Sequence, residues 1–458
     1  MDLDYFSQLT PTLGGLAVLA AVLQLYSRRT DPASGKQANA AVTSAYISFR
    51  ALWLVIYFIV MGADWLQGPY VYSLYESLGF SRSEIANLFI CGFASSMFFG
   101  TFIGSLADKF GRKKFAVLFG VLYSASCLTK LSNKFYVLLF GRFLSGIATS
   151  LLFSVFEAWM VAEHFKRGFP PELLSSSFSA ACFGNGIVAI VAGLVASYAA
   201  SMYGFVAPFM ISLALLLVSI VLVSALFSEN YGNASVQVKE TFTNAFHDVQ
   251  KDTKIPILGL MQSLFEGAMY TFVFMWTPTL NEAVLAGRPD GADGDGELDT
   301  ERMPYGVIFA CFMVAIMIGS TIFEVLVRTI QPERIAVGLF VISGGALLVP
   351  ALVQDQNIVL GSFLVFELCC GIYFPCLGTL RSKYIPERTR ATIMNFFRMG
   401  LNILVVIVLL KVASLNNQTI FLICSAWLGL AFLLAQSFVG MVARSAADPL
   451  ASTTPGQE

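Results

Sequence analysis

The chain has 458 residues, of which 57% are hydrophobic and only 12% are charged. A soluble protein carries about twice that share of charge, so the composition indicates a membrane protein. The net charge of −1 gives no electrostatic indication of binding to nucleic acid. All eight cysteines fall inside apolar runs, so no disulfide framework is expected. Two histidines, His164 and His247, are too few for a histidine metal cluster.

Thirteen apolar stretches have the roughly 20 residues needed to cross a bilayer. The first, near 9–27, follows an acidic start and precedes Arg28 and Arg29. That charge order differs from a signal peptide and places the N-terminus outside. Twelve further helices are expected near 46–75, 84–107, 115–131, 135–161, 173–199, 204–227, 255–280, 304–327, 334–353, 357–380, 388–413 and 418–442.

Lysine and arginine are unevenly distributed between the two expected faces of the membrane. Most of them fall in segments assigned to the cytoplasm, including the loop 108–114 and the polar linker 228–254. The segments assigned to the outside hold only Arg82, Lys130, Lys134, Arg288, Arg302 and Lys411. This bias again predicts an outer N-terminus, and it predicts a cytoplasmic C-terminus.

The two halves of the chain carry matching features in the same order. The first helix of each half holds one acidic residue, Asp64 or Glu266. The fourth holds one charge four residues before a glycine, at Arg142 or Glu367. These matches predict an all-α polytopic membrane protein built from two pseudo-symmetric six-helix bundles. The expected parts are 1–45 with the extra transmembrane helix, the bundle 46–227, the cytoplasmic linker 228–254, the bundle 255–442 and the polar tail 443–458.

A short basic loop between two apolar stretches reads Gly104-Ser-Leu-Ala-Asp108-Lys-Phe-Gly111-Arg112-Lys-Lys. Its glycines allow close helix approach and a tight turn, and Asp108 can form an ion pair with Arg112. The spacing resembles the helix 2–3 loop motif of the major facilitator superfamily, which implies an alternating-access transporter. Gly104, Asp108, Gly111 and Arg112, with Glu157 of the fourth helix, are then expected to form a cytoplasmic gate. A positive-inside loop without a gating role is the alternative.

Five charged residues fall within the expected membrane interior: Asp64, Arg142, Glu266, Glu367 and Arg398. Each costs at least about 2.5–3.5 kcal/mol at the bilayer centre unless it is paired or hydrated. Arg142 and Arg398 are candidates for binding an anionic substrate, because guanidinium forks match tetrahedral oxyanions. The three acids are then candidates for carrying protons. The alternative is that both arginines pair permanently with these acids and only hold the bundles together.

A narrower resemblance rests on three features: the extra first helix, the segment 262–278, and Phe156-Glu157-Ala-Trp159. Over residues 1–445 or so, the chain resembles the eukaryotic molybdate-anion transporter family, also called major facilitator superfamily domain-containing protein 5. The resemblance implies uptake of molybdate at the plasma membrane without a cofactor. A vacuolar or other endomembrane is the alternative location, and a monomer is the favoured state.

Charge balance predicts how such uptake is driven. Moving a dianion against an inside-negative potential of 100 mV costs about 4.6 kcal/mol, so co-transported cations are required, and protons are the expected ones. The sequence has no G-x-x-x-x-G-K-[ST] signature for ATP. No nucleophile, base and orienting group converge to indicate an enzyme. Two alternatives stay open: a transporter of a sugar or organic anion, and a membrane receptor or scaffold that moves nothing.

Overall fold

The structure is a computed structural model of the chain, and it describes residues 11–16, 40–170, 172–232, 238–286, 303–386, 389–412 and 414–447. Every regular element within these ranges is a helix. Ten of the described helices are long and apolar enough to cross a membrane. The all-α polytopic fold predicted from the sequence is confirmed. The expected extra helix at 9–27 lies outside the described residues, apart from 11–16, which are helical.

The helices of the first half follow the predicted order. They are α2 (Ala40–Trp65), the 3-10 turn η1 (Gly68–Tyr70), α3 (Val71–Ser77), α4 (Arg82–Phe110), α5 (Arg112–Thr129), α6 (Phe135–Lys166), α7 (Glu172–Tyr203) and α8 (Ala207–Leu226). The helix expected at 46–75 is broken near Pro69, because proline lacks the N–H that a helix interior requires. A capping box starts α4, where Ser81 and Glu84 each bond the other's backbone N–H.

The second half begins with a helix that the sequence analysis missed. The elements are α9 (Val238–Lys251), α10 (Lys254–Ala286), α11 (Tyr305–Leu326), α12 (Pro332–Leu352), α13 (Gln356–Tyr384), α14 (Arg390–Lys411) and α15 (Asn417–Ala447). The missed helix, α9, lies in the polar linker expected at 228–254. It buries Ala245 while Phe246 stays exposed. Its Asp248 accepts a 2.8 Å hydrogen bond from the Thr389 hydroxyl.

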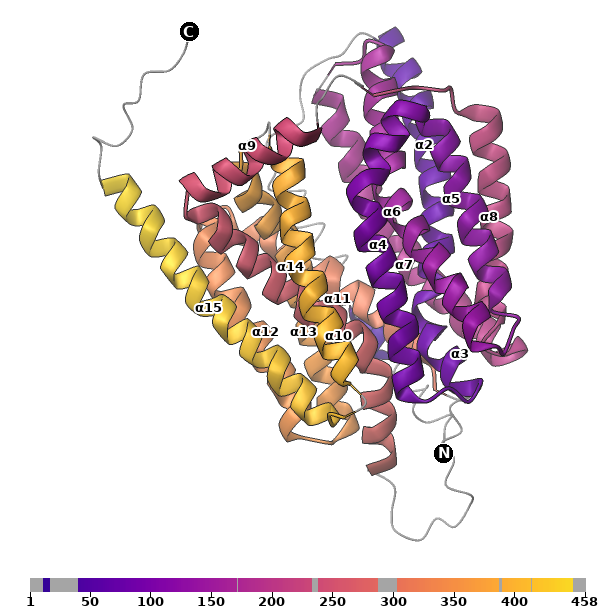
Figure 1. Ribbon diagram of the computed structural model, residues 1–458, viewed down its shortest axis with the longest axis vertical. Coiled ribbons are helices and arrows are strands. Elements are labelled where there is room, and N and C mark those ends of the chain that lie inside the picture. The colour runs from indigo at the N-terminus through magenta and orange to yellow at the C-terminus, as the bar shows by residue number, and fades with distance from the viewer. Residues whose placement is uncertain are drawn as a thin grey trace. The chain divides into compact units, whose positions relative to one another are not determined.

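Contacts divide the chain into two compact units. Unit 1 comprises Met1–Val236, Arg288–Met317 and Leu409–Ser414, and unit 2 comprises Gln237–Gly287, Ile318–Val408 and Leu415–Glu458. The first half of α11 therefore belongs to unit 1, whereas the sequence analysis assigned the whole helix to the second bundle. Apart from the first half of α11 and the end of α14, each unit contains the long helices of one half of the chain (Figure 1).

The core of unit 1 is aromatic. Both α4 and α5 pack along α6, and α5 also packs on α8. Trp53, Phe119, Phe156 and Trp159 are almost completely buried. The indole N–H of Trp53 donates to the Phe156 carbonyl oxygen at 3.1 Å, which joins α2 to α6 and satisfies a polar group inside the bundle.

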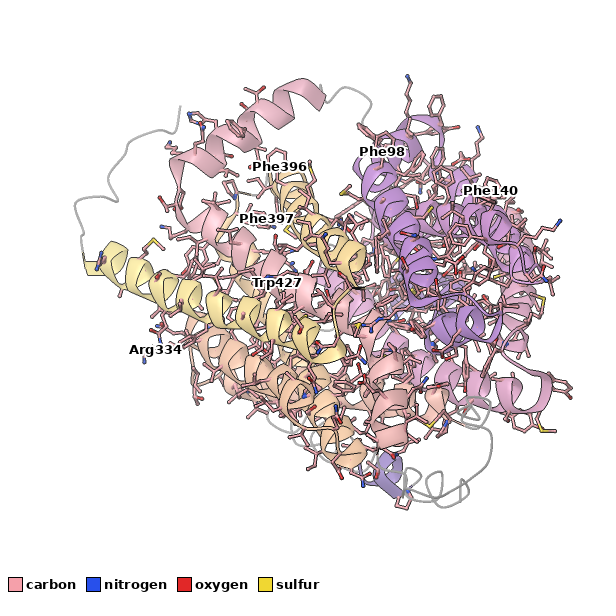
Figure 2. The ribbon with its side chains drawn as sticks, turned by 60° about the horizontal axis from the view of Figure 1, so that its bottom comes forward. Phe98, Phe140, Arg334, Phe396, Phe397 and Trp427 are labelled. Atoms are coloured by element: carbon pink, nitrogen blue, oxygen red, sulfur yellow. The ribbon has the colours of Figure 1, made fainter. Side chains whose placement is uncertain are left out.

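In unit 2, α10 packs against α13 and α15, and α12 packs against the same two helices. Glycines of α10 leave room for large side chains. A Cβ atom on Gly259 would lie 2.2 Å from the ring of Phe397, on α14, and Gly267 faces Trp427, on α15 (Figure 2). The absence of a side chain at Gly259 lets Phe397 of α14 approach α10, whereas a Cβ at Gly267 would make only ordinary contact with Trp427 at 3.5 Å.

Large apolar side chains also cover outward-facing surfaces. Phe98 on α4 is 60% exposed and Phe140 on α6 is 57% exposed (Figure 2). Contiguous exposed apolar surface of this kind is unfavourable in water but stable against lipid tails. The surface therefore agrees with a bundle that is embedded in a bilayer.

Candidate transport site and gate

Arg142 of unit 1 lies beside an acid but does not form an ion pair with it. Asp64, at the end of α2, accepts a 2.6 Å hydrogen bond from the Tyr123 hydroxyl of α5. Arg142 is close enough to Asp64 for an electrostatic interaction. Its Nε donates to the Leu88 carbonyl oxygen at 3.3 Å, and its guanidinium lies 4.8 Å from the Phe89 ring centroid. Among the described residues, neither terminal nitrogen of Arg142 has a hydrogen-bond partner.

Two glycines let α4 and α6 cross closely beside this guanidinium. A Cβ atom on Gly92 would lie 2.8 Å from Nη2 of Arg142. A Cβ atom on Gly146 would lie 1.9 Å from the Ser95 hydroxyl oxygen. Because neither glycine has a side chain, the two helices meet closely and Arg142 is held in one place. The sequence pattern Arg142-x-x-x-Gly146 thus has a packing reason.

Unit 2 contains a second cluster of the same composition. Glu266 of α10 accepts a 2.9 Å hydrogen bond from the Tyr373 hydroxyl of α13. It interacts electrostatically with Arg381 of α13 and Arg398 of α14. Arg381 also donates to the Gln262 side-chain oxygen at 3.2 Å. Neither arginine forms an ion pair with a carboxylate in the part of the chain that the structure describes.

The structure brings together only some of the predicted interior charges. Arg398 lies near Glu266, but its side chain is exposed at the surface of unit 2 rather than buried. Glu367 is buried in α13 and is hydrogen-bonded with Cys370 of the same helix. Within the described ranges it forms no ion pair. Among the described residues neither Arg142 nor Arg398 forms an ion pair with these acids, and the choice between substrate binding and structural pairing stays a prediction.

Three polar residues of these clusters were missed from the sequence. Arg381 was assigned to a cytoplasmic segment, because a cation near the end of an apolar run indicates a flanking loop. Tyr123 and Tyr373 could not be recognised as partners of the interior acids, since tyrosine is common near membrane surfaces. A tyrosine inside a helix of a bundle that also holds an intramembrane acid is the pattern that would have identified both.

The basic loop between α4 and α5 contains the expected ion pair. Arg112 Nη2 lies 2.7 Å from Asp108 Oδ1. Arg112 also donates to the Ala158 carbonyl oxygen of α6 at 3.1 Å. Gly111 has a φ of +114°, a conformation that residues with a side chain rarely adopt. The tight turn predicted for this glycine is therefore present.

The segment 227–232, directly after α8, holds this loop in place. No motif in the sequence indicates this role of the segment. Three hydrogen bonds join them: Lys113 N–H to Glu229 Oε1 at 2.9 Å, Arg112 N–H to the Asn230 carbonyl at 3.0 Å, and Gly232 N–H to the Asp108 carbonyl at 2.9 Å. A Cβ atom on Gly111 would lie 2.6 Å from the Glu229 carboxylate. Glycine is required there for both conformation and space.

The C-terminal end of α6 contacts the other side of the 227–232 segment. The Trp159 indole N–H donates to the Ser228 carbonyl at 2.7 Å, and its ring stacks on Phe227 with centroids 3.7 Å apart. The Ser228 hydroxyl donates to Glu163 at 2.8 Å, and Glu163 also pairs with Arg167 at 3.0 Å. The loop, the segment and α6 thus form one connected polar network.

Two predicted gate residues lie apart from this network. A Cβ atom on Gly104 would meet nothing within 4 Å, so the close helix approach expected there is wrong for this structure. Glu157 is exposed and interacts electrostatically with Tyr57 of α2 rather than with Arg112. The difference arises because Arg112 bonds the backbone of α6 at Ala158 instead of the neighbouring carboxylate.

The chemistry of the two clusters suits reversible binding. Each combines a carboxylate that accepts a hydrogen bond from a tyrosine with a nearby arginine that forms no ion pair among the described residues. Guanidinium groups can hold an anion, and intramembrane carboxylates can exchange protons. Among the described residues, no group of three His, Cys, Asp or Glu side chains is placed to hold a metal ion.

Comparison with known proteins places the chain in a family. A family model described as sugar transporters, 12 TM, matches residues 9–372. The molybdate-anion transporter of Xenopus tropicalis is 34% identical over 448 residues, which cover 94% of each chain. This chain belongs to the molybdate-anion transporter family. Relatives with the same name from Takifugu rubripes and Danio rerio are 34% and 32% identical, over 85% of this chain and 84% of theirs.

Solved structures agree with this family's fold. The nucleoside transporter NupG matches with a TM-score of 0.63 at 15% identity, over 86% of this chain and 99% of that one. An auto-inhibited peptide transporter of the POT family matches with a TM-score of 0.66 at 12% identity, over 87% and 97%. This member of the family therefore has a major facilitator fold, and it is an integral membrane transport protein rather than an enzyme.

Proposed function

We propose that this chain carries molybdate across the membrane by alternating access, coupled to protons. The main support is its similarity, over 94% of its length, to a relative named a molybdate-anion transporter. The geometry of Arg142 agrees with this, because its two terminal nitrogens have no protein partner among the described residues and suit a tetrahedral oxyanion. Arg398, near Glu266, is the second candidate ligand.

Proton coupling is proposed from charge balance. The inward movement of a dianion against 100 mV costs about 4.6 kcal/mol, which two protons cancel and three overcome. Asp64, Glu266 and Glu367 are the candidate carriers. The first two each accept a hydrogen bond from a tyrosine, at 2.6 Å and 2.9 Å.

Uptake of radiolabelled molybdate by cells that express the chain tests both parts of the proposal. We expect saturable uptake that a proton uncoupler abolishes and that tungstate inhibits. Uptake no greater than in cells without the protein, with its membrane delivery confirmed, would contradict molybdate transport. Uptake that is the same with and without the uncoupler would contradict proton coupling but not molybdate transport.

A sugar or organic anion is the second candidate substrate. The family model that matches residues 9–372 is described as sugar transporters, which favours this reading. Both arginines would then have structural roles. Inhibition of uptake by sugars but not by tungstate, measured in the same cells, would support this alternative.

Replacing Gly92 with alanine is expected to weaken molybdate binding roughly tenfold, equivalent to about 1.4 kcal/mol. The added Cβ would lie 2.8 Å from Nη2 of Arg142, so the flexible guanidinium must move. The concentration for half-maximal uptake measures the effect. Gly345→Ala is the matched control, because its Cβ would meet nothing within 4 Å. An unchanged concentration in Gly92→Ala would show that the position of Arg142 does not set affinity.

A double substitution separates substrate binding from structural pairing at Arg398. If Arg398 binds substrate, Arg398→Ala should lose uptake, and adding Glu266→Gln should not restore it. If Arg398 instead neutralises Glu266, the pair of changes should recover both protein level and uptake. Adding Glu367→Gln is the control, because Glu367 hydrogen-bonds with Cys370. Surface protein and molybdate uptake are measured together.

We also propose that the protein lies in the plasma membrane with its N-terminus outside and its C-terminus in the cytoplasm. The supporting pattern is the acidic start of the chain with Arg28 and Arg29 after the first apolar stretch. An antibody should label an N-terminal epitope tag on intact cells. Labelling only after permeabilisation, in cells whose surface delivery is confirmed with a biotinylation reagent, would reverse the orientation.

A further inference from the structure

Lys130 is a buried amine at the end of unit 1 that also holds Asp64. It follows α5 directly, and only 2% of it is exposed. Its ammonium donates a short hydrogen bond to the Tyr75 hydroxyl of α3. It also lies 4.9 Å from the Tyr75 ring centroid and 5.9 Å from that of Phe209, on α8. The distribution of charges along the sequence places Lys130 in an outer segment, a position from which burial is not expected.

The surroundings of Lys130 supply no matching negative charge. Its strongest charged neighbour is Arg142, which carries the same sign. Asp64 is the acid nearby, and it already accepts from Tyr123. Lys130 forms no ion pair with a carboxylate in the described part of the chain. Burying a charge is costly unless it is paired, and two neighbouring cations repel each other. Burial and the like charge of Arg142 therefore disfavour the ammonium form of Lys130, and a bound anion would stabilise that form.

We propose that Lys130, Arg142 and the Tyr75 hydroxyl form a binding site for tetrahedral dianions. Arg142 offers two terminal nitrogens in a planar fork, and Lys130 offers the two N–H donors that it does not use on Tyr75. This inference rests on the proposed function and deepens it, because it assigns the preference for a doubly charged substrate to Lys130. When Asp64 is protonated, a dianion supplies one negative charge for Arg142 and one for the ammonium form of Lys130, whereas a neutral sugar supplies neither.

The position of this site in the bundle fits a role in capturing substrate. The helix α5 begins at the gate loop with Arg112 and ends at Thr129, directly before Lys130. Its 18 residues span about 27 Å at 1.5 Å per residue. The proposed anion site and the 108–112 gate loop therefore lie at opposite ends of unit 1, about one bilayer thickness apart.

Thermal unfolding of the purified full-length protein in detergent tests the proposal without requiring transport. The probes are molybdate, sulfate and perrhenate, which are all tetrahedral, and perrhenate carries only one charge. In wild type, we expect both dianions to raise Tm at concentrations at least tenfold lower than perrhenate does. In Lys130→Met, molybdate should be needed at ten- to hundredfold higher concentration, and the preference for dianions should disappear. Lys134→Met removes an exposed cation four residues away and should behave as wild type.

The outcomes distinguish the site from the proposed function. If Tm of Lys130→Met rises at the same molybdate concentrations as Tm of wild type, and dianions are still preferred over perrhenate, the inference is wrong while molybdate transport stands. If sulfate stabilises wild type through Lys130 but molybdate neither binds nor is taken up, the site stands and the proposed substrate is wrong. Stabilisation of wild type by neither dianion overturns the site.

A second variant covers the case in which Lys130→Met does not fold. Tyr75→Phe removes the hydroxyl and keeps the aromatic ring beside the ammonium. It should weaken binding of molybdate about tenfold, measured as the rise in Tm relative to the variant's own Tm without ligand. If the molybdate concentration that raises Tm is the same in Tyr75→Phe as in wild type, the role assigned to Lys130 and Tyr75 is wrong.

Discussion

Arg142→Lys is expected to raise the molybdate concentration for half-maximal uptake by about 10- to 100-fold, equivalent to about 1.4–2.7 kcal/mol. Lysine keeps the positive charge but loses the planar fork. It also loses the Nε hydrogen bond to the Leu88 carbonyl at 3.3 Å and the guanidinium contact with the Phe89 ring. Because the charge remains, the amount of protein at the membrane should not change.

Uptake kinetics at matched surface expression measure this effect. Arg444→Lys, at the exposed end of α15, is the control for a change of arginine to lysine away from both clusters. Normal affinity in Arg142→Lys would remove Arg142 from the substrate site. A loss of surface protein in Arg142→Ala that Asp64→Asn restores, with uptake recovered as well, would instead identify a structural pair.

The fold was largely predictable because the bilayer restricts the choices. Backbone groups in lipid must be satisfied within a helix, so apolar runs of sufficient length become helices. The prediction failed where this rule does not apply. Pro69 breaks the first expected helix inside an apolar run. The polar helix α9 forms outside the membrane-spanning runs, where packing of residues such as Ala245 stabilises the helix instead of contact with lipid.

The site was less predictable than the fold. The pair Asp108–Arg112 is local, since the two residues are four apart on the chain, and spacing alone suggested it. The network around it depends on partners from distant elements, such as Glu229, which bonds a backbone N–H and leaves no side-chain pattern in the sequence. Lys130 shows the same difficulty, because its burial depends on Tyr75 and Phe209, which precede and follow it by many residues.

Gly111→Ala is expected to reduce the maximal rate of uptake by at least about tenfold without changing substrate affinity. Alanine is strained at a φ of +114°, and its Cβ would lie 2.6 Å from the Glu229 carboxylate. Backbone strain of this kind costs about 1–3 kcal/mol, which changes the ratio of two conformers about 5- to 150-fold. The loop would release the 227–232 segment, and the conformer that this network stabilises would become rarer.

The controls for Gly111→Ala separate backbone strain from loss of the network. Gly204→Ala places alanine at a φ of +80° with nothing within 4 Å, at a turn outside the gate network, so it adds strain alone. Asp108→Asn removes the 2.7 Å ion pair with Arg112 but leaves the backbone free of strain, and its rate should fall in the same direction by a smaller factor. Surface protein is quantified for each variant alongside initial rates. Gly111→Ala and Asp108→Asn could instead both reach the membrane and transport at the wild-type rate. The 108–112 loop would then be a structural link between α4 and α5 that does not control the conformational change. Alternating access would in that case not depend on the contacts that hold the loop against the 227–232 segment.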